Sequence, residues 1–154
     1  MNAKATTALF FIASMSTPVF ADNATWLNVG GISHHISTNW DQGARYNESN
    51  PGLGIEHEVG VINYMAGFYK NSIGNTSNYL VAEKIVYKRG IFGAGFLGGM
   101  VDGYHLNDGR PIPAAAVTAT VERNRLGVRF MYMPGIRGQS APVLSVQIRL
   151  RLSR

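Results

Sequence analysis

Side chains suited to nucleophilic catalysis occur at two places in the first half of the chain. His34 and His35 are adjacent, and Ser72 directly follows Asn71. A serine hydroxyl becomes a useful nucleophile when an imidazole accepts its proton, and that imidazole needs a group that orients it. Either histidine could be the base and Ser72 the nucleophile, with Asn71 or Glu48 as the orienting group. Serines and histidines are also common in loops, so spacing alone favours polar loop residues without a catalytic role.

The histidines do not predict a metal site. His57 and His105 complete the set of four, and no two of them have the i, i+4 spacing that brings ligands together on a helix. Adjacent histidines on a strand would point to opposite faces. The chain has no cysteine, which excludes a thiolate zinc site and a cysteine nucleophile. We therefore expect neither a metal nor any other cofactor.

The first residues are typical of a secretory signal peptide. Lys4 precedes an apolar stretch, residues 8–15, and small residues lead to Ala21. That stretch is much shorter than the roughly 20 residues with which an α-helix crosses a bilayer, and no later segment comes closer. We expect residues 1–21 to be removed and residues 22–154 to form one domain. Any crossing of a membrane must then be made by strands.

Turn-forming residues separate eight segments rich in β-branched, aromatic and glycine residues. Each segment is near the roughly 9 to 11 residues that a tilted strand needs to span an outer membrane. This pattern predicts an all-β fold, an eight-stranded antiparallel transmembrane barrel in the bacterial outer membrane. The predicted strands are residues 24–36, 52–60, 62–71, 77–87, 90–101, 113–122, 125–133 and 143–152.

Apolar and polar residues alternate along these segments, most clearly near the end of the chain. Ile148 falls on the opposite face from Arg149 and Arg151, and residues 53–58, 117–122 and 126–132 follow the same rule. We expect the apolar face to meet lipid and the polar face to line the lumen. Glu56 and Glu58 should then pair with arginines such as Arg149 and Arg151. A lipocalin-like barrel is the alternative, but its apolar face would be inside, where these arginines argue against it.

Two phenylalanines in the fifth segment extend this reasoning. If Phe92 and Phe96 face lipid, Gly93, Gly95 and Gly99 face the lumen, where they leave space that an acyl chain could fill. Glycines also relieve crowding and let strands bend, and this second interpretation is favoured.

The connections alternate in length. Tight turns are predicted at residues 60–61, 88–90 and 123–124, and longer loops at residues 37–51, 72–76, 102–112 and 134–142. Outer-membrane barrels have short periplasmic turns and longer extracellular loops. Both ends of the barrel domain would therefore lie on the periplasmic side, and the histidines, the first long loop and Ser72 would share the outer rim.

Three segments resemble the PagP-type lipid A palmitoyltransferases: residues 45–48 followed by glycines 52 and 54, residues 66–72, and residues 130–135. They occur in the same order and at similar spacing, and the resemblance covers roughly residues 26–152. It implies an eight-stranded outer-membrane barrel that moves an acyl chain from a phospholipid to lipid A, using a histidine, an aspartate and a serine at the extracellular face. The chain departs from the family in having no amphipathic helix before the first strand and no aromatic residue at its end.

The resemblance assigns the family serine to Ser72 and the family histidine to His34 or His35. The family aspartate falls on Asn71, which cannot carry the negative charge that stabilises an imidazolium. The fold is therefore better supported than the activity.

Cations beside the long loops suit the phosphates of lipopolysaccharide. The predicted substrate-binding residues are Arg45, Tyr46, Glu48, Lys70, Arg110 and Arg137. The formal charge of +5 could also indicate nucleic acid, but the cations are dispersed along the chain and a secreted protein rarely meets it. We expect a monomer whose partners are lipopolysaccharide and phospholipids, with no nucleic acid.

Two functions remain open. The first is an acyltransferase or esterase that modifies lipid A. The second is a non-catalytic barrel with a surface or envelope-integrity role, which the asparagine at position 71 favours. A passive pore is not expected, because side chains fill the lumen of an eight-stranded barrel.

Overall fold

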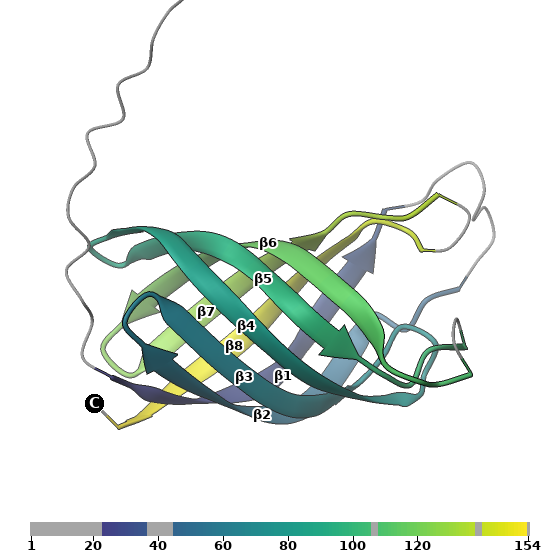
Figure 1. Cartoon of the computed structure of the whole chain (residues 1–154), viewed down its shortest axis with the longest axis horizontal. Coiled ribbons are helices and arrows are strands. Elements are labelled where there is room, and N and C mark those ends of the chain that lie inside the picture. Colours follow the sequence, from purple (N-terminus) through teal and green to yellow (C-terminus); the bar gives the residue numbers. More distant parts are fainter. Residues whose placement is uncertain (1–22, 37–44, 106–107, 138–139, 154) are drawn as a thin grey trace, which may run out of the picture.

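A computed structural model describes residues 23–36, 45–105, 108–137 and 140–153. Within them the chain forms one closed antiparallel barrel, in which each strand pairs with the next and β8 closes against β1 (Figure 1). The predicted fold is confirmed, and no strand boundary differs from its prediction by more than three residues. The strands are β1 (Thr25–His35), β2 (Ser49–Val59), β3 (Ile62–Lys70), β4 (Thr76–Arg89), β5 (Phe92–Val101), β6 (Ile112–Arg123), β7 (Leu126–Met133) and β8 (Val143–Ser153).

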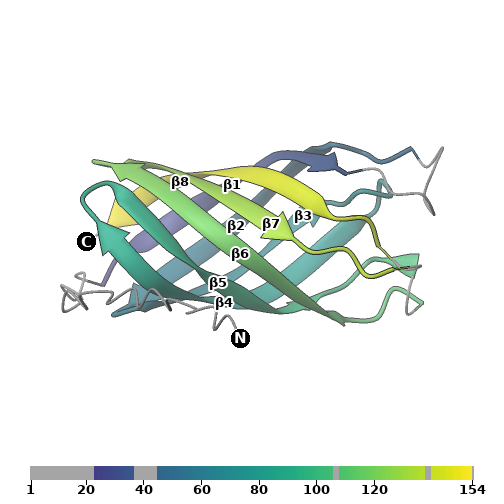
Figure 2. The ribbon, with the colours of Figure 1, turned by 90° about the horizontal axis from the view of Figure 1, so that it is seen from above.

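The short turns share one end of the barrel and the longer connections share the other (Figures 1 and 2). We call these the short-turn end and the long-loop end. Thr25 pairs with Ser153, so β1 begins and β8 ends at the short-turn end. The predicted signal peptide, residues 1–21, lies outside the described residues, as does most of the first long loop. Among the described residues there is no helix long and apolar enough to cross a membrane.

Each short turn has two residues, of which the first has a positive φ: Gly60, Gly90 and Asn124. Glycine and asparagine adopt this conformation with little strain, and it suits the twist of a hairpin. The turn predicted at residues 60–61 is confirmed. The other two predictions are displaced by one or two residues, because Lys88 and Arg89 end β4 and Arg123 ends β6. The turns therefore form at the residues that tolerate positive φ, and not at the charged residues that precede them.

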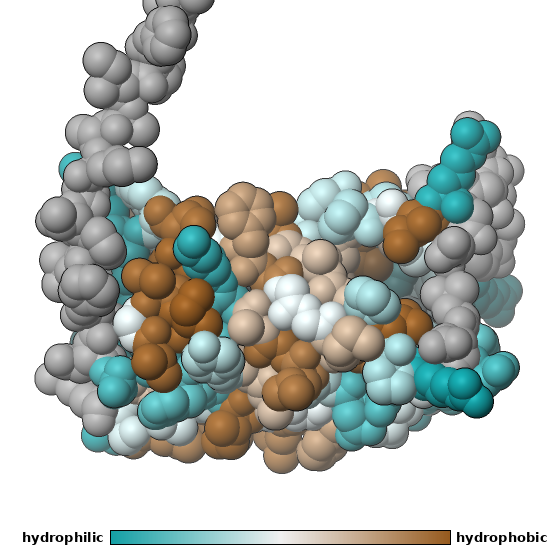
Figure 3. Space-filling view, viewed as in Figure 1, coloured by the Kyte–Doolittle hydropathy of each residue, from teal (hydrophilic) through white to brown (hydrophobic). Residues whose placement is uncertain are grey.

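The outer wall is apolar. Large hydrophobic side chains such as Leu80, Phe96 and Leu126 are exposed on it, and Figure 3 shows hydrophobic residues over much of one face of the wall. The predicted outward orientation of Phe92 and Ile148 is confirmed. An apolar wall around a polar interior is the arrangement of a transmembrane barrel and the reverse of a lipocalin.

Buried ion pairs fill the middle of the lumen. Arg129 contacts Glu56 at 2.8 Å and Glu83 at 2.7 Å, and all three side chains are fully buried. Arg149 contacts Glu56 and Glu58, as predicted, and also Glu122. Each of these charged side chains contacts at least one side chain of opposite charge. Their attraction offsets the free-energy cost of removing the charges from water.

Arg151 differs from its prediction. It lies 3.8 Å from Glu122 instead of pairing with Glu56 or Glu58, because Arg149, two residues nearer the middle of the barrel, already contacts both. Arg149 and Arg151 also hold the buried Trp26 ring between them, at 4.3 and 4.4 Å from its centre. Trp26 and these two arginines thereby fill the lumen near the short-turn end.

Glycines allow close approach within the wall. A Cβ at Gly95 would lie 2.4 Å from the Lys84 carbonyl oxygen, and one at Gly99 would lie 2.3 Å from that of Leu80. Across the barrel, a Cβ at Gly54 would lie 2.0 Å from the Tyr79 hydroxyl. These glycines accommodate neighbouring strands and a tyrosine, which supports the crowding interpretation over an acyl channel.

Candidate functional site

The predicted catalytic residues lie at the long-loop end, at the end of β1 and just after β3, and the segment before β2 binds both. His34 ends β1 together with His35, Glu48 immediately precedes β2, and Asn71 and Ser72 follow β3. The Asn47 backbone N–H donates to the Ser72 carbonyl at 2.7 Å, and its side-chain amide donates to the Asn71 carbonyl at 2.9 Å. These bonds hold the segment that carries Glu48 against the segment that carries Ser72. We call His34, Glu48, Asn71 and Ser72 the rim site.

A histidine and a carboxylate meet at this site. His34 Nδ1 lies 3.1 Å from Glu48 Oε1, and their side chains are 71% and 48% exposed. The contact follows from the pairing of β1 with β2, since the Ser33 N–H donates to the Glu48 carbonyl at 2.9 Å. A carboxylate on Nδ1 fixes the orientation of the ring and leaves Nε2 to exchange a proton with a substrate or a hydroxyl.

His35 has a different environment. It is buried, and its ring stacks on Tyr46 with 4.0 Å between the ring centres. Its backbone N–H donates to the same Glu48 oxygen, at 3.2 Å. The adjacent histidines therefore take opposite orientations, as a strand requires. His34 is the one whose ring contacts the carboxylate and is open to solvent.

The side chain of Asn71 joins its own loop to β4 and to the β5–β6 connection. It is fully buried, and its amide nitrogen donates to Ser77 Oγ at 2.9 Å and to the Gly103 carbonyl at 3.1 Å. Its amide oxygen accepts the backbone N–H groups of Ile73 and Asn75. Both donors and both acceptor positions of the side chain are thus in use. Of the two candidate orienting groups, the structure brings Glu48, and not Asn71, into contact with a histidine ring.

Polar contacts from β3 and β4 to the β5–β6 connection brace the same end of the barrel. The Asn78 backbone N–H donates to Asp102 at 2.6 Å, and the Asn78 amide donates to the other carboxylate oxygen at 3.0 Å. These donors lower the pKa of Asp102 below its usual value. The hydroxyls of Tyr69 and Tyr104 lie 3.0 Å apart. Sequence reasoning placed Asp102 and Tyr104 in this loop but could not identify their partners, which come from other strands.

The predicted substrate-binding cations are exposed at the long-loop end. Arg45, Lys70, Arg110 and Arg137 have no carboxylate within 4 Å among the described residues. Their charges are therefore open to anions from the membrane surface. His105 is exposed in the β5–β6 connection, whereas His57 contacts the Thr25 hydroxyl at 3.1 Å near the short-turn end. No three metal-ligating side chains gather anywhere in the described part of the chain.

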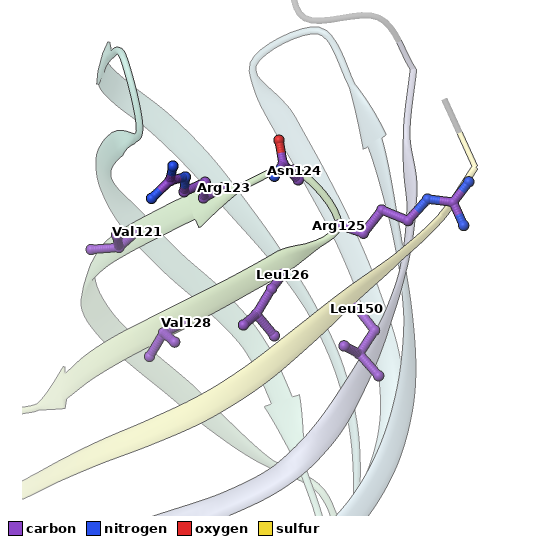
Figure 4. A pocket seen from close by; sticks show the side chains of 7 residues that line it. All are labelled: Val121, Arg123, Asn124, Arg125, Leu126, Val128 and Leu150. Carbon is purple, nitrogen blue, oxygen red and sulfur yellow. The ribbon is translucent and has the colours of Figure 1, made fainter.

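Two hollows lie at the opposite end of the barrel from the rim site. One of about 490 Å³ and one of about 300 Å³ border the β6–β7 turn at the short-turn end (Figure 4). They were not predicted, because their lining depends on the register with which β6, β7 and β8 pair.

Comparisons with known proteins bear on the fold. No protein-family model matches the chain, and no curated protein matches it in sequence. A solved structure described as a de novo designed transmembrane β-barrel superposes with a TM-score of 0.61 at 10% identity, over 87% of this chain and all of the designed one. None of these comparisons names the PagP-type family or lipid A. A structural match at 10% identity is evidence for the fold alone. The chain therefore has the fold of a transmembrane β-barrel.

Proposed function

We propose that the chain is a bacterial outer-membrane enzyme that acts at the rim site, either as an acyltransferase that moves an acyl chain from a phospholipid to lipid A or as an esterase of lipid A. In this proposal His34 is the general base, Glu48 is its orienting carboxylate and Ser72 is the participating hydroxyl. The observation that carries it is the contact of His34 with Glu48, on a segment that is hydrogen-bonded to Ser72.

Glu48 supplies the charge that Asn71 lacks. When His34 accepts the Ser72 proton at Nε2, the imidazolium that forms is stabilised by the carboxylate on Nδ1. The Ser72 oxygen then attacks the ester carbonyl, and the proton passes from His34 to the departing alcohol oxygen. A hydroxyl of lipid A, or water, releases the acyl group from Ser72 by the reverse steps.

The substrate assignment rests on charge and on location. Exposed cations at the long-loop end match the phosphates of lipid A, and the apolar wall below them would sit among acyl chains. Tyr79 and the buried ion pairs occupy the lumen beneath the rim. The reacting acyl chain would therefore approach along the outer wall.

Mass spectrometry of lipid A tests this function. Cells that make the protein should show a gain or loss of one acyl chain relative to cells with the empty vector. Ser72→Ala, His34→Ala and Glu48→Gln should each abolish the change, whereas Ser49→Ala, an exposed serine at the same end of the barrel, should retain it. Unmodified lipid A from cells in which the barrel is folded in the outer membrane would refute the proposal.

The second candidate is a non-catalytic barrel that supports the integrity of the envelope. The complete use of the Asn71 amide in structural hydrogen bonds favours it, because the position that the resemblance assigns to an aspartate holds a residue that joins its own loop to β4 and the β5–β6 connection. On this alternative, lipid A stays unchanged, while cells that lack the protein become more sensitive to detergents. Ser72→Ala would then restore resistance as well as the unaltered protein does.

A further inference from the structure

The larger hollow lies on the outer wall, where the β6–β7 turn meets β8. Its floor is apolar and consists of Val121, Val128, Leu126 and Leu150, and its edge carries Arg123 and Arg125. Figure 4 shows the two arginines extending to opposite sides of the turn, with the aliphatic side chains along the strands beside it. The hollow thus combines a strip of hydrocarbon with two cations at one end.

Strand register explains this arrangement. Arg123 pairs with Leu126, and Leu126 pairs with Leu150 on the next strand. Val121 and Val128 form the next outward-facing pair toward the middle of the barrel. Side chains alternate along each strand, so all these residues face outward while Glu122, between Val121 and Arg123, faces the lumen.

The two cations have no acidic partner among the described residues. Arg123 and Arg125 are exposed, and the nearest carboxylate in sequence, Glu122, points inward to Arg149, Lys88 and Arg151. Arg125 also borders the second hollow, which continues along the end of β8. Two unpaired guanidinium groups beside an apolar strip at the end of a barrel wall require a ligand that is anionic at one end and apolar at the other.

We propose that this hollow, which we call the β6–β7 lipid site, binds an anionic phospholipid of the leaflet at the short-turn end. Arg123 and Arg125 flank the headgroup from the two sides of the turn, and their guanidinium groups attract its phosphate. One acyl chain lies along Leu126, Leu150 and the valines. A zwitterionic lipid binds more weakly because its ammonium group is repelled by the same arginines. This site is independent of any catalysis at the rim site.

Trp26 provides a probe of this site. It is fully buried in the lumen behind β7, where a Cβ at Gly127 would lie 3.4 Å from its ring. Gly127 faces inward between Leu126 and Val128, so only the thickness of the wall separates the indole from the hollow. The chain has one other tryptophan, Trp40. Replacing Trp40 with phenylalanine leaves Trp26 as the only tryptophan.

The experiment measures quenching of Trp26 by phospholipids brominated on their acyl chains. The full protein, with Trp40→Phe, is reconstituted in phosphatidylcholine vesicles that contain increasing fractions of brominated phosphatidylglycerol or brominated phosphatidylcholine. We expect phosphatidylglycerol to be favoured on the order of fivefold for each arginine that reaches the phosphate. Arg123→Gln with Arg125→Gln should reduce this preference to near unity.

A charge-matched control separates a site from a diffuse basic surface. Lys84→Gln with Arg89→Gln removes two exposed cations from β4, outside the hollow, and should keep the preference. Migration on unheated gels confirms that every variant is folded. Equal quenching by the two lipids in the parent protein, or an equal loss of preference in both double variants, would overturn the proposal.

Discussion

Arg129 donates hydrogen bonds to both oxygens of Glu56, at 3.0 and 2.8 Å, from a strand three places away around the barrel. Both side chains are completely buried, and Glu83 contacts the same guanidinium at 2.7 Å. A carboxylate left in this position without its partner would be desolvated without compensation. The pair therefore ties opposite sides of the lumen together.

Loss of that guanidinium should strongly destabilise the barrel. Arg129→Met keeps the length of the side chain but leaves Glu83 without its cation, so we expect the free energy of unfolding to fall by about 3 to 5 kcal/mol. Urea unfolding of the reconstituted protein measures the change. Arg89→Met, on the exposed end of β4, should change stability by less than about 0.5 kcal/mol. Similar losses for the two variants would contradict a structural role for the buried pair.

Two glycines with different surroundings should respond differently to a methyl group. A Cβ at Gly67 would lie 2.4 Å from the Leu53 carbonyl oxygen and 2.5 Å from the Gly54 Cα, both of them backbone atoms. Gly67→Ala should therefore destabilise the barrel by about 1 to 3 kcal/mol. At Gly98 the nearest atom is 4.0 Å away, and Gly98→Ala should be tolerated. The same unfolding assay compares them, and equal tolerance would show that β2 and β3 can separate freely.

Restoring an aspartate at position 71 should not create a better enzyme. Asn71→Asp replaces two donated hydrogen bonds, to Ser77 Oγ and the Gly103 carbonyl, with repulsion between oxygens. We expect a loss of about 1 to 3 kcal/mol of stability and no gain in lipid A modification. Unfolding and lipid A mass spectrometry test the two effects. Increased modification without loss of stability would mean that position 71 acts on the reaction.

Acid should release the contact between Asn78 and Asp102. The Asn78 N–H and amide groups lower the pKa of the Asp102 carboxyl in the folded protein. The contact therefore contributes stability above the unfolded pKa, about 3.9, and this contribution is lost as the pH falls through the lower folded value. Hydrogen exchange of the Asn78 amide should accelerate over that range. Asp102→Asn should abolish this dependence, and a carboxyl titration centred above the unfolded value would contradict it.

The sequence by itself determined the eight strands, the lipid-facing sides of β2, β6, β7 and β8, and the positions of the long loops. These properties are local, because alternation with a period of two depends on neighbouring residues and a turn depends on a glycine or asparagine that tolerates positive φ. For the same reason Ile148 and Arg149 could be assigned to the wall and the lumen without knowledge of any other strand.

Closure and register of the barrel decided the rest. Any inward arginine could have met any inward glutamate, and the stagger of the strands brings Arg129 to Glu83 and leaves Arg151 with Glu122. The same geometry gives His34 its carboxylate and directs the amide of Asn71 to Ser77 on β4. Pairing across the barrel joins residues that are far apart in sequence, and its outcome depends on the shape of the whole sheet and not on any one segment.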